Sequence, residues 1–413
     1  MQNNKTHWAS LLTLIVLGFG LLFLTAASVG LGINSLINLF SGEGMPTAEM
    51  ISAFAFFFHV ILLFICSWFV LQKTRGIEQA DSPVKLPFAW WQAIVAVGIP
   101  VIGALIGGGI TLFEIEWLSW IFLPLLTVLV IVPPIWLFFG SGSNGLEAGP
   151  RWRFFAVFGL SMTIGPAIMI VLELVVLIFG LIFASVYLAI AQPLIFDEIT
   201  NISQLVMDGM GQEELLSMVT PYIANPAVLA AGIGYIAVIV PLIEELFKPL
   251  AVWLFARKIE SPAQGFVLGM LSGAAFGVFE SLNASADGTI GWAVIVAARA
   301  GTSLLHIATS GLVGWGIVSA FKEKKFGRLA GAFLAAVLIH GVWNAAAAGA
   351  GITAIGETIG KPEWLYNYAP AMLCGLLVLG IGIFAVLLAS NRKLRSQHLP
   401  ITPPEEEKVE LTS

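Results

Sequence analysis

Long apolar runs alternate with short polar segments along most of the chain. The hydrocarbon core of a bilayer is ~30 Å thick and needs about 20 apolar residues per helix. Because the fifth apolar run is too long for one upright span and contains Pro166, we expect it to tilt, kink or extend beyond the bilayer. Runs of sufficient length predict an all-α polytopic membrane protein with about ten transmembrane helices, at approximately 10–33, 50–71, 89–110, 117–139, 153–190, 226–256, 264–283, 291–320, 329–349 and 368–390.

Composition supports a membrane protein and excludes several other classes. Of the 413 residues, 58% are apolar and only 11% are Asp, Glu, Lys or Arg, against roughly 25% charged residues in soluble domains. The formal charge of -6 provides no basic excess with which to bind nucleic acid. Cys66 and Cys374 lie inside apolar runs and predict neither a disulfide nor a metal site.

Basic residues divide between alternate loops. Sixteen of the 19 Lys and Arg residues, from Lys5 to Lys408, fall on one side of the ten spans, whereas the opposite loops carry Lys361 and several acids. Since basic residues concentrate in cytoplasmic loops, we expect a multi-pass protein of the cell membrane with both termini in the cytoplasm. The remaining two, Lys248 and Arg299, lie inside predicted spans.

Ionisable and amide side chains concentrate in spans six to nine. Such a group at bilayer depth costs at least ~2.5–3.5 kcal/mol, so it usually marks a site or a buried pair. Elsewhere, Glu173 and His59 lack polar partners at helical spacing, and we expect them to be packing or interfacial residues. The concentrated set is Glu244, Glu245, Lys248, Glu280, Arg299, His306, His340 and Asn344.

Depth provides an independent test of a common site. Counting ~1.5 Å per residue from the cytoplasmic helix ends places Glu244, Glu280, His306, His340 and Asn344 at similar heights, about 17–24 Å. The same count places Arg299 near the outer edge, at about 32 Å. These heights predict one site near the midplane, slightly toward the exterior.

Span six combines paired acids with two prolines. Glu244 and Lys248 lie one turn apart on one helix face, and Glu245 lies about 100° around the helix. Pro241 and Pro249 lack the N–H that a helix needs, and unpaired backbone at this depth is tolerated only inside protein or beside water. Taken alone, the segment is also explained by a structural ion pair at a kink.

The other polar pairs occur at helical spacing. Arg299 and His306 are two turns apart on one face, and His340 and Asn344 are one turn apart, so they aim an imidazole and an amide at one point. Each has a structural alternative, because Glu280 or Arg299 could lie at a span end and His340 could join two helices by a hydrogen bond.

A repeated small-xxx-small pattern marks span seven. Such residues allow a neighbouring helix to approach at backbone distance, so this pattern predicts helix packing. The four residues are Gly265, Gly269, Gly273 and Gly277.

The motifs together resemble the PrsW family of intramembrane proteases, within a wider group that includes the CAAX prenyl endopeptidases and bacteriocin-processing enzymes. The resemblance covers roughly residues 226–350 and implies proteolysis within or near the membrane. The best-known family members make the first cut in an anti-sigma factor. The matching motifs are E-E-x-x-K at Glu244, Glu245 and Lys248, F-x-x-x-E at Phe276 and Glu280, Arg299 followed by His306, and H-x-x-x-N at His340 and Asn344.

Amide hydrolysis in a bilayer needs water, a base to activate it and donors that stabilise the oxyanion. Glu244 or Glu245 can act as the base, His306 and His340 can orient water or donate a proton, and the Asn344 amide can stabilise the oxyanion. Glu280 belongs to the same predicted catalytic set. Lys248 and Arg299 would provide charge support.

Zinc is an alternative to this metal-free chemistry. His306 and His340, with Glu244 or Glu280, could supply three ligands and leave an open position for water. No H-E-x-x-H motif places two histidines on one helix face, and Lys248 supplies positive charge without a cation. The sequence therefore favours water activated by a glutamate, with no cofactor.

These interpretations divide the chain into five parts and name its partners. We expect a lipid bilayer and a single-span membrane protein substrate, cut toward its extracytoplasmic end. The parts are an N-terminal membrane region (1–190), an extracytoplasmic acidic segment (191–225), a PrsW-like protease core in spans six to nine (226–350), a last transmembrane helix (351–391) and a disordered cytoplasmic tail (392–413).

Two functions of other classes compete with proteolysis. A proton- or ion-coupled transporter also places broken helices and charged residues at the midplane, but we find no internal repeat that pairs two proline-broken helices. A non-catalytic membrane scaffold would explain the glycine pattern but not the polar residues at matched depth.

Overall fold

The computed structural model describes residues 7–41, 46–84, 88–285, 288–289, 291–354 and 366–397. Within these residues, ten helices are long and apolar enough to cross a membrane, which confirms the predicted class. The predicted disordered tail from residue 398 and four basic residues lie outside the described residues: Lys5, Lys85, Lys361 and Lys408. The uninterrupted spans are α1 (Trp8–Ser41), α2 (Thr47–Thr74), α3 (Trp90–Leu112), α4 (Glu116–Ser143), α5 (Arg151–Ala191), α11 (Pro262–Ala284), α12 (Trp292–Glu323), α13 (Phe326–Ala354) and α15 (Ala369–Ser396).

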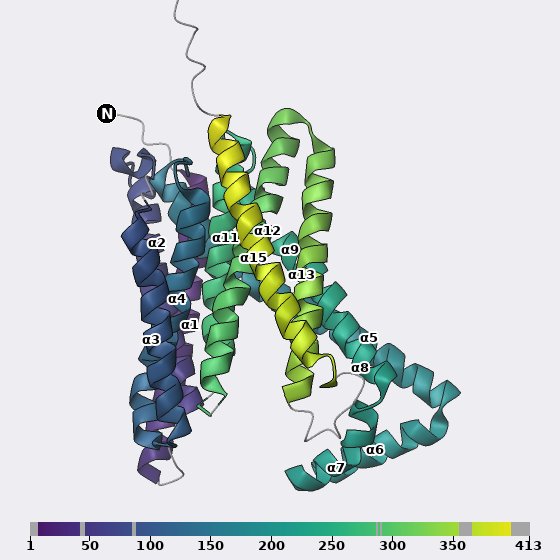
Figure 1. Cartoon of the computed structure of the whole chain (residues 1–413). Coiled ribbons are helices and arrows are strands. Elements are labelled where there is room, and N and C mark those ends of the chain that lie inside the picture. The colour runs from purple at the N-terminus through teal and green to yellow at the C-terminus, as the bar shows by residue number, and fades with distance from the viewer. Residues whose placement is uncertain are drawn as a thin grey trace, which may run out of the picture.

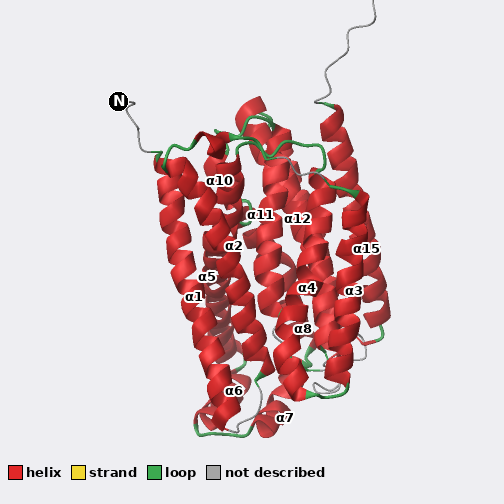
Figure 2. Ribbon diagram, turned by 90° about the vertical axis from the view of Figure 1, so that its left-hand side faces the viewer, coloured by secondary structure: helices red, strands yellow, loops and turns green. Residues whose placement is uncertain are grey.

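The spanning helices run roughly parallel through most of the bundle (Figure 2). α11 and α12 form its centre, where most of their residues are buried by other helices. α2, α4 and α5 pack against α11, whereas α13 and α15 pack against α12. α1 begins and α15 ends at the same end of the bundle (Figure 1). α15 continues to Ser396, past the predicted limit at residue 391.

The glycines of α11 allow α12 to approach closely. A Cβ atom on Gly265 would lie 2.6 Å from the main-chain oxygen of Gly314, and one on Gly269 would lie 3.0 Å from the Gly314 Cα. Real Cβ atoms do not come this close to backbone, so any larger residue would push the two helices apart. The small-residue pattern thus has the packing role that its spacing predicts.

Helix α5 is unusually long and oblique. It has 41 residues and runs through Pro166 without ending, which gives it a length of ~60 Å at 1.5 Å per residue. Figure 1 shows it leaning away from the other helices toward the end of the bundle opposite the termini. There the predicted acidic segment forms two short helices, α6 (Pro193–Met207) and α7 (Gln212–Ile223).

The sixth span is broken into four pieces. The uninterrupted run 226–256 is replaced by α8 (Pro226–Gly234), the π-helix η2 (Tyr235–Ile239), α9 (Val240–Phe247) and α10 (Leu250–Phe255). Pro241 has no N–H to bond one turn back, and the backbone widens just before it, where the Val240 N–H bonds the Tyr235 carbonyl. Pro249 separates α9 from α10. A single π-helical turn inside a helix often occurs at a functional site.

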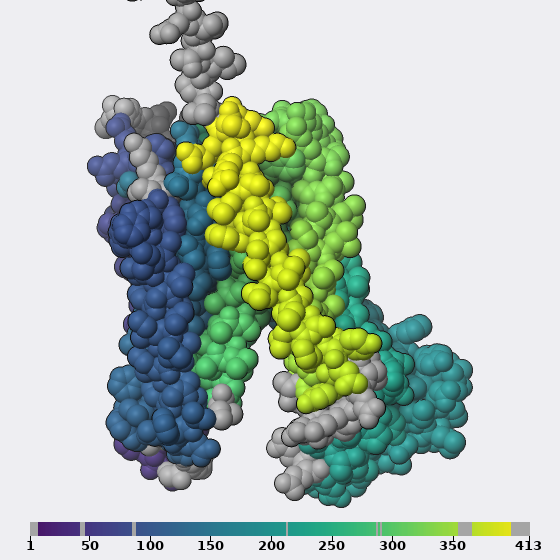
Figure 3. Space-filling model, in the orientation of Figure 1, coloured from purple at the N-terminus to yellow at the C-terminus, as the bar shows by residue number. Residues whose placement is uncertain are grey.

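The molecule is hollowed at the end opposite the termini. Figure 3 shows the hollow between the first part of α12 and the adjoining parts of α13 and α15. Because α12 begins at this end, Arg299 lies ~10 Å and His306 ~21 Å along the helix from its first residue. Arg299 is therefore nearer to this end than His306 is.

Candidate active site

Helix α9 carries the two adjacent acids and the lysine of span six. Glu244 and Glu245 lie in its middle, and Lys248 follows its last residue. The Lys248 N–H donates to the Glu244 carbonyl at 2.7 Å, and the Ser272 hydroxyl of α11 donates to the Lys248 carbonyl. The two contacts fix the backbone from which all three side chains project.

The Lys248 ammonium group is completely buried among four side chains. Its Nζ lies 2.9 Å from Glu244 Oε2 and 2.8 Å from Glu245 Oε1. The same atom lies 2.8 Å from His306 Nδ1 and 3.3 Å from His340 Nδ1. The predicted compensation of Glu244 by Lys248 is therefore present, and it extends to Glu245.

His306 of α12 is held from its far side by Glu280 of α11. His306 Nε2 lies 2.8 Å from Glu280 Oε2, so this nitrogen carries a proton that it donates to the carboxylate. The ring also packs edge-on against Phe276, with centroids 4.9 Å apart. The other nitrogen, Nδ1, is then left with a lone pair on the side of Lys248.

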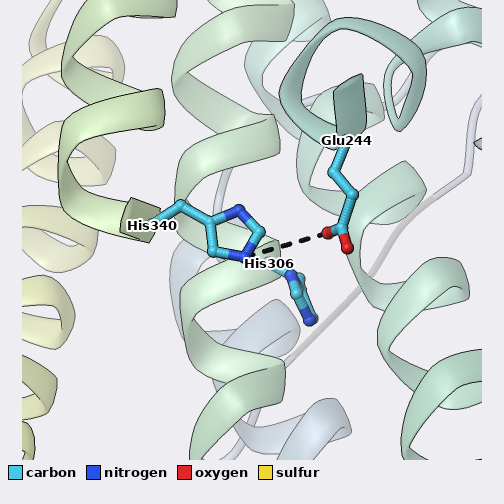
Figure 4. Close-up of side chains that lie close together, drawn as sticks. All are labelled: Glu244, His306 and His340. Carbon is cyan, nitrogen blue, oxygen red and sulfur yellow. Dashed lines mark ion pairs between the residues drawn. The ribbon is translucent and has the colours of Figure 1, made fainter. Parts of the chain in front are cut away.

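His340 of α13 is held in the same way by Glu245. His340 Nδ1 lies 2.8 Å from Glu245 Oε1, and its Nε2 lies 3.8 Å from Glu244 Oε2. Figure 4 shows His340 directed at Glu244, with His306 beside them. Each imidazole thus has one nitrogen on a carboxylate and the other on the side of Glu244 and Lys248.

Glu244, His306 and His340 could hold a metal ion. One ligand atom from each lies within 4.8 Å of the others, and all three residues are buried. Glu244 Oε2 lies 3.8 Å from His340 Nε2 and 2.9 Å from Lys248 Nζ. A glutamate and two histidines form a typical donor set for catalytic zinc, and metal-bound histidines usually donate their second N–H to a carboxylate or carbonyl. The donor atoms and their supporting carboxylates therefore fit zinc.

An ion pair between α11 and α12 borders this cluster. Arg299 Nη2 lies 2.9 Å from Glu280 Oε1, and the two side chains are partly exposed, at 22% and 29%. Glu280 therefore joins Arg299 to His306. Although Arg299 was expected near the outer edge, it is linked to the common site through this carboxylate.

The amide of Asn344 lies elsewhere. Its Nδ2 donates to the Ile236 carbonyl of η2 at 3.1 Å, and the residue is partly exposed. The structure therefore brings His340, but not the Asn344 amide, into contact with the acids of α9. Gly341, on the turn between them, approaches the Ala237 carbonyl so closely that a Cβ atom would collide with it.

Two hydroxyl groups were missed by the sequence analysis. Thr309 donates to Glu245 Oε1 at 3.1 Å, and Ser272 holds the Lys248 carbonyl while contacting Ser161 Oγ of α5 at 2.6 Å. Thr309 follows His306 by three residues, which places both on one face of α12. That spacing could have identified Thr309 from the sequence. No comparable pattern in the sequence identifies Ser272.

Glu173 and His59 occupy different settings. His59 is completely buried in α2, where Nδ1 lies 2.5 Å from the Ala55 carbonyl and the ring contacts Phe279. Glu173 is half-buried, and its main-chain carbonyl accepts a 2.7 Å hydrogen bond from Tyr235 of η2. The His59 ring thus packs between α2 and α11, whereas Glu173 joins α5 to η2 through its main chain.

Comparison with known proteins relates more than half of the chain to one family. The model of the family described as PrsW family intramembrane metalloprotease matches residues 150–374. The match extends from the start of α5 into α15 and includes the whole cluster described above. No curated protein and no solved structure matches the chain.

Proposed function

The chain belongs to the PrsW family of intramembrane metalloproteases, and we propose that it is an endopeptidase that cuts membrane-spanning proteins at the cluster of Glu244, His306 and His340. One observation carries this proposal. Three helices bring these side chains together in a buried position, and a second carboxylate orients each imidazole. A fixed tautomer and ring orientation are what a group that activates water requires.

Glu244, rather than Glu245, is the carboxylate that acts on water. Glu245 is completely buried and is engaged by Lys248, His340 and Thr309. The Glu244 side chain retains 8% exposure, and its Oε2 is paired with Lys248 Nζ at 2.9 Å. Glu244 can therefore take a proton from water and return it to the leaving amine, while Glu245 positions His340 and Lys248.

Zinc would be held by Glu244, His306 Nδ1 and His340 Nε2, and when bound it would lower the pKa of a water molecule and polarise the peptide carbonyl. These three residues would orient the water and the scissile bond from three sides. The supporting carboxylates Glu280 and Glu245 would keep the ligand nitrogens unprotonated.

A metal-free form of the same chemistry is favoured by one specific contact. The Lys248 ammonium lies among the three proposed ligands, 2.8 Å from His306 Nδ1 and 2.9 Å from Glu244 Oε2. In that form Lys248 provides the positive charge and Glu244 alone activates water, as the sequence favoured. The two forms differ in whether Lys248 must leave this position.

The substrate reaches the cluster from the hollow at the end opposite the termini (Figure 3). Arg299 and Glu280 are the partly exposed charges nearest this approach. Because the basic loops predict cytoplasmic termini, this end faces the outside of the cell membrane. Cleavage is thus expected toward the extracytoplasmic end of a single-span substrate.

Reconstitution in liposomes with single-span substrates tests the proposal. Glu244→Gln should lower the cleavage rate by about 10²–10⁴-fold, whereas Glu116→Gln, at the exposed start of α4, should leave it unchanged. A transporter or a scaffold would leave every substrate uncut by the wild-type protein. Stoichiometric zinc, lost together with activity in a chelator and restored with it, would establish the metal form. Full activity without zinc would establish the form that uses Lys248.

A further inference from the structure

A pocket separate from the hollow lies at the end of the bundle where α15 terminates. It has a volume of about 240 Å³ and lies between α11, α12, α13 and α15. Trp315, in its wall, is nine residues or ~13.5 Å along α12 from His306, so the pocket is distinct from the candidate active site. Its polar lining is Arg328, Ser390, Lys393 and Gln397, and its apolar lining includes Phe266 and Trp315.

The charge of this pocket is positive. The Arg328 guanidinium lies over the Trp315 ring, 5.2 Å from its centroid, and Nη1 lies 2.7 Å from Glu323 Oε2. The same Glu323 oxygen also lies 2.8 Å from Lys325 Nζ. In the part of the chain that the structure describes, Lys393 makes no salt bridge, and the pocket lining contains two basic residues and no acid.

We propose that this pocket binds the phosphate-bearing headgroup of an anionic phospholipid. Basic pockets between transmembrane helices on the cytoplasmic side bind such headgroups, and tryptophan is typical of the interfacial level. Arg328 and Lys393 bind the phosphate, while Ser390 and Gln397 donate hydrogen bonds to headgroup oxygens.

The size of the pocket limits what enters it. Pockets for drug-sized ligands have volumes of ≈ 300–1,000 Å³, so about 240 Å³ admits a headgroup rather than a whole lipid. The acyl chains remain outside, in the bilayer, where α15 exposes apolar side chains such as Val386. A lipid bound here would join α12, α13 and α15.

Native mass spectrometry of the purified full chain tests this site with three probes: phosphatidylglycerol, phosphatidylcholine and inorganic phosphate. Phosphatidylglycerol should be retained and should raise the thermal unfolding temperature. The pair Arg328→Gln and Lys393→Gln should weaken its binding about 30-fold, because each basic residue contributes roughly a factor of five. Trp315→Phe should weaken it about two- to fivefold, because Phe forms a weaker cation–π contact than Trp.

The matched control is the pair Lys324→Gln and Arg392→Gln, which removes equal charge from exposed positions of the same end. If this pair weakens lipid binding as strongly, the attraction belongs to the general surface and the site is refuted. Equal retention of phosphatidylcholine, or displacement by inorganic phosphate at equal affinity, would also overturn the assignment. None of these substitutions touches the proposed catalytic cluster, so failure of this site leaves the proposed proteolysis intact.

Discussion

Gly273 of α11 lies directly against the main chain of His306 of α12. A Cβ atom on Gly273 would collide with the His306 carbonyl and would lie 3.0 Å from the Ile307 Cα. The contact involves backbone on the histidine side, so no rotation of a side chain can relieve it. Helix packing and imidazole placement therefore depend on the same glycine.

Gly273→Ala should consequently lower both the cleavage rate and the stability. Overpacking of this kind costs about 1–3 kcal/mol, and a displacement near 1 Å of a catalytic group can lower a rate about 100-fold. The measurement is the cleavage rate in liposomes beside the thermal unfolding temperature. Gly277→Ala is the matched control, because its new Cβ would meet Ser303 at an ordinary 3.4–3.5 Å. Equal losses in both variants would contradict the prediction.

Lys248→Met should strongly destabilise the protein. The change leaves Glu244 and Glu245 without their shared cation, and breaking a buried ion pair costs about 3–5 kcal/mol. Adding Glu245→Gln should recover part of this loss, because it removes one of the two uncompensated charges. Thermal unfolding of the two purified variants measures the effect. A double variant no more stable than Lys248→Met would show that the charges are not the cause.

Arg299→Ala should lower kcat about 10–100-fold with little change in KM. Arg299 reaches His306 only through Glu280, and loss of such a supporting partner typically has this size of effect. Arg299→Lys should restore part of the rate, since it keeps the charge. The comparison variant is Arg257→Ala, at an exposed position outside the cluster. A rise in KM instead would assign Arg299 to substrate binding.

Alkaline phosphatase fusions test the orientation. Fusions after residues in 195–220 should be active, because this enzyme needs the oxidising extracytoplasmic environment to form its disulfides. Fusions after residues in 322–328 should be inactive, because that loop is basic and expected in the cytoplasm. Reversed activities would invert the side on which the substrate is cut.

The sequence was sufficient to predict the ten spans and most of the ionisable members of the polar cluster. Apolar runs of about 20 residues have few alternatives in a bilayer, and ionisable residues at that depth are too costly to occur without partners. Glu244, Glu280, His306 and His340 were thus identifiable before any packing was known. Their similar depths followed from helix rise alone.

The partners across helices could not be predicted in this way. Helical spacing fixes which residues share a face, but not how that face is rotated toward its neighbours. The π-turn at Tyr235–Ile239 adds to this uncertainty, because one extra residue per turn shifts the following faces around the helix axis. Asn344 illustrates the result, since a carbonyl of this turn binds its amide.

Because α5 is so long, its tilt depends on the thickness of the membrane. A helix of ~60 Å can lie within a hydrocarbon core of ~30 Å only at a steep tilt, and most of its second half is exposed apolar surface. A change in lipid chain length alters the hydrophobic mismatch and so the tilt that best covers that surface. Because α6 begins only two residues after the end of α5, such a change should also move α6. Acyl-chain length is therefore expected to act on this protein mechanically.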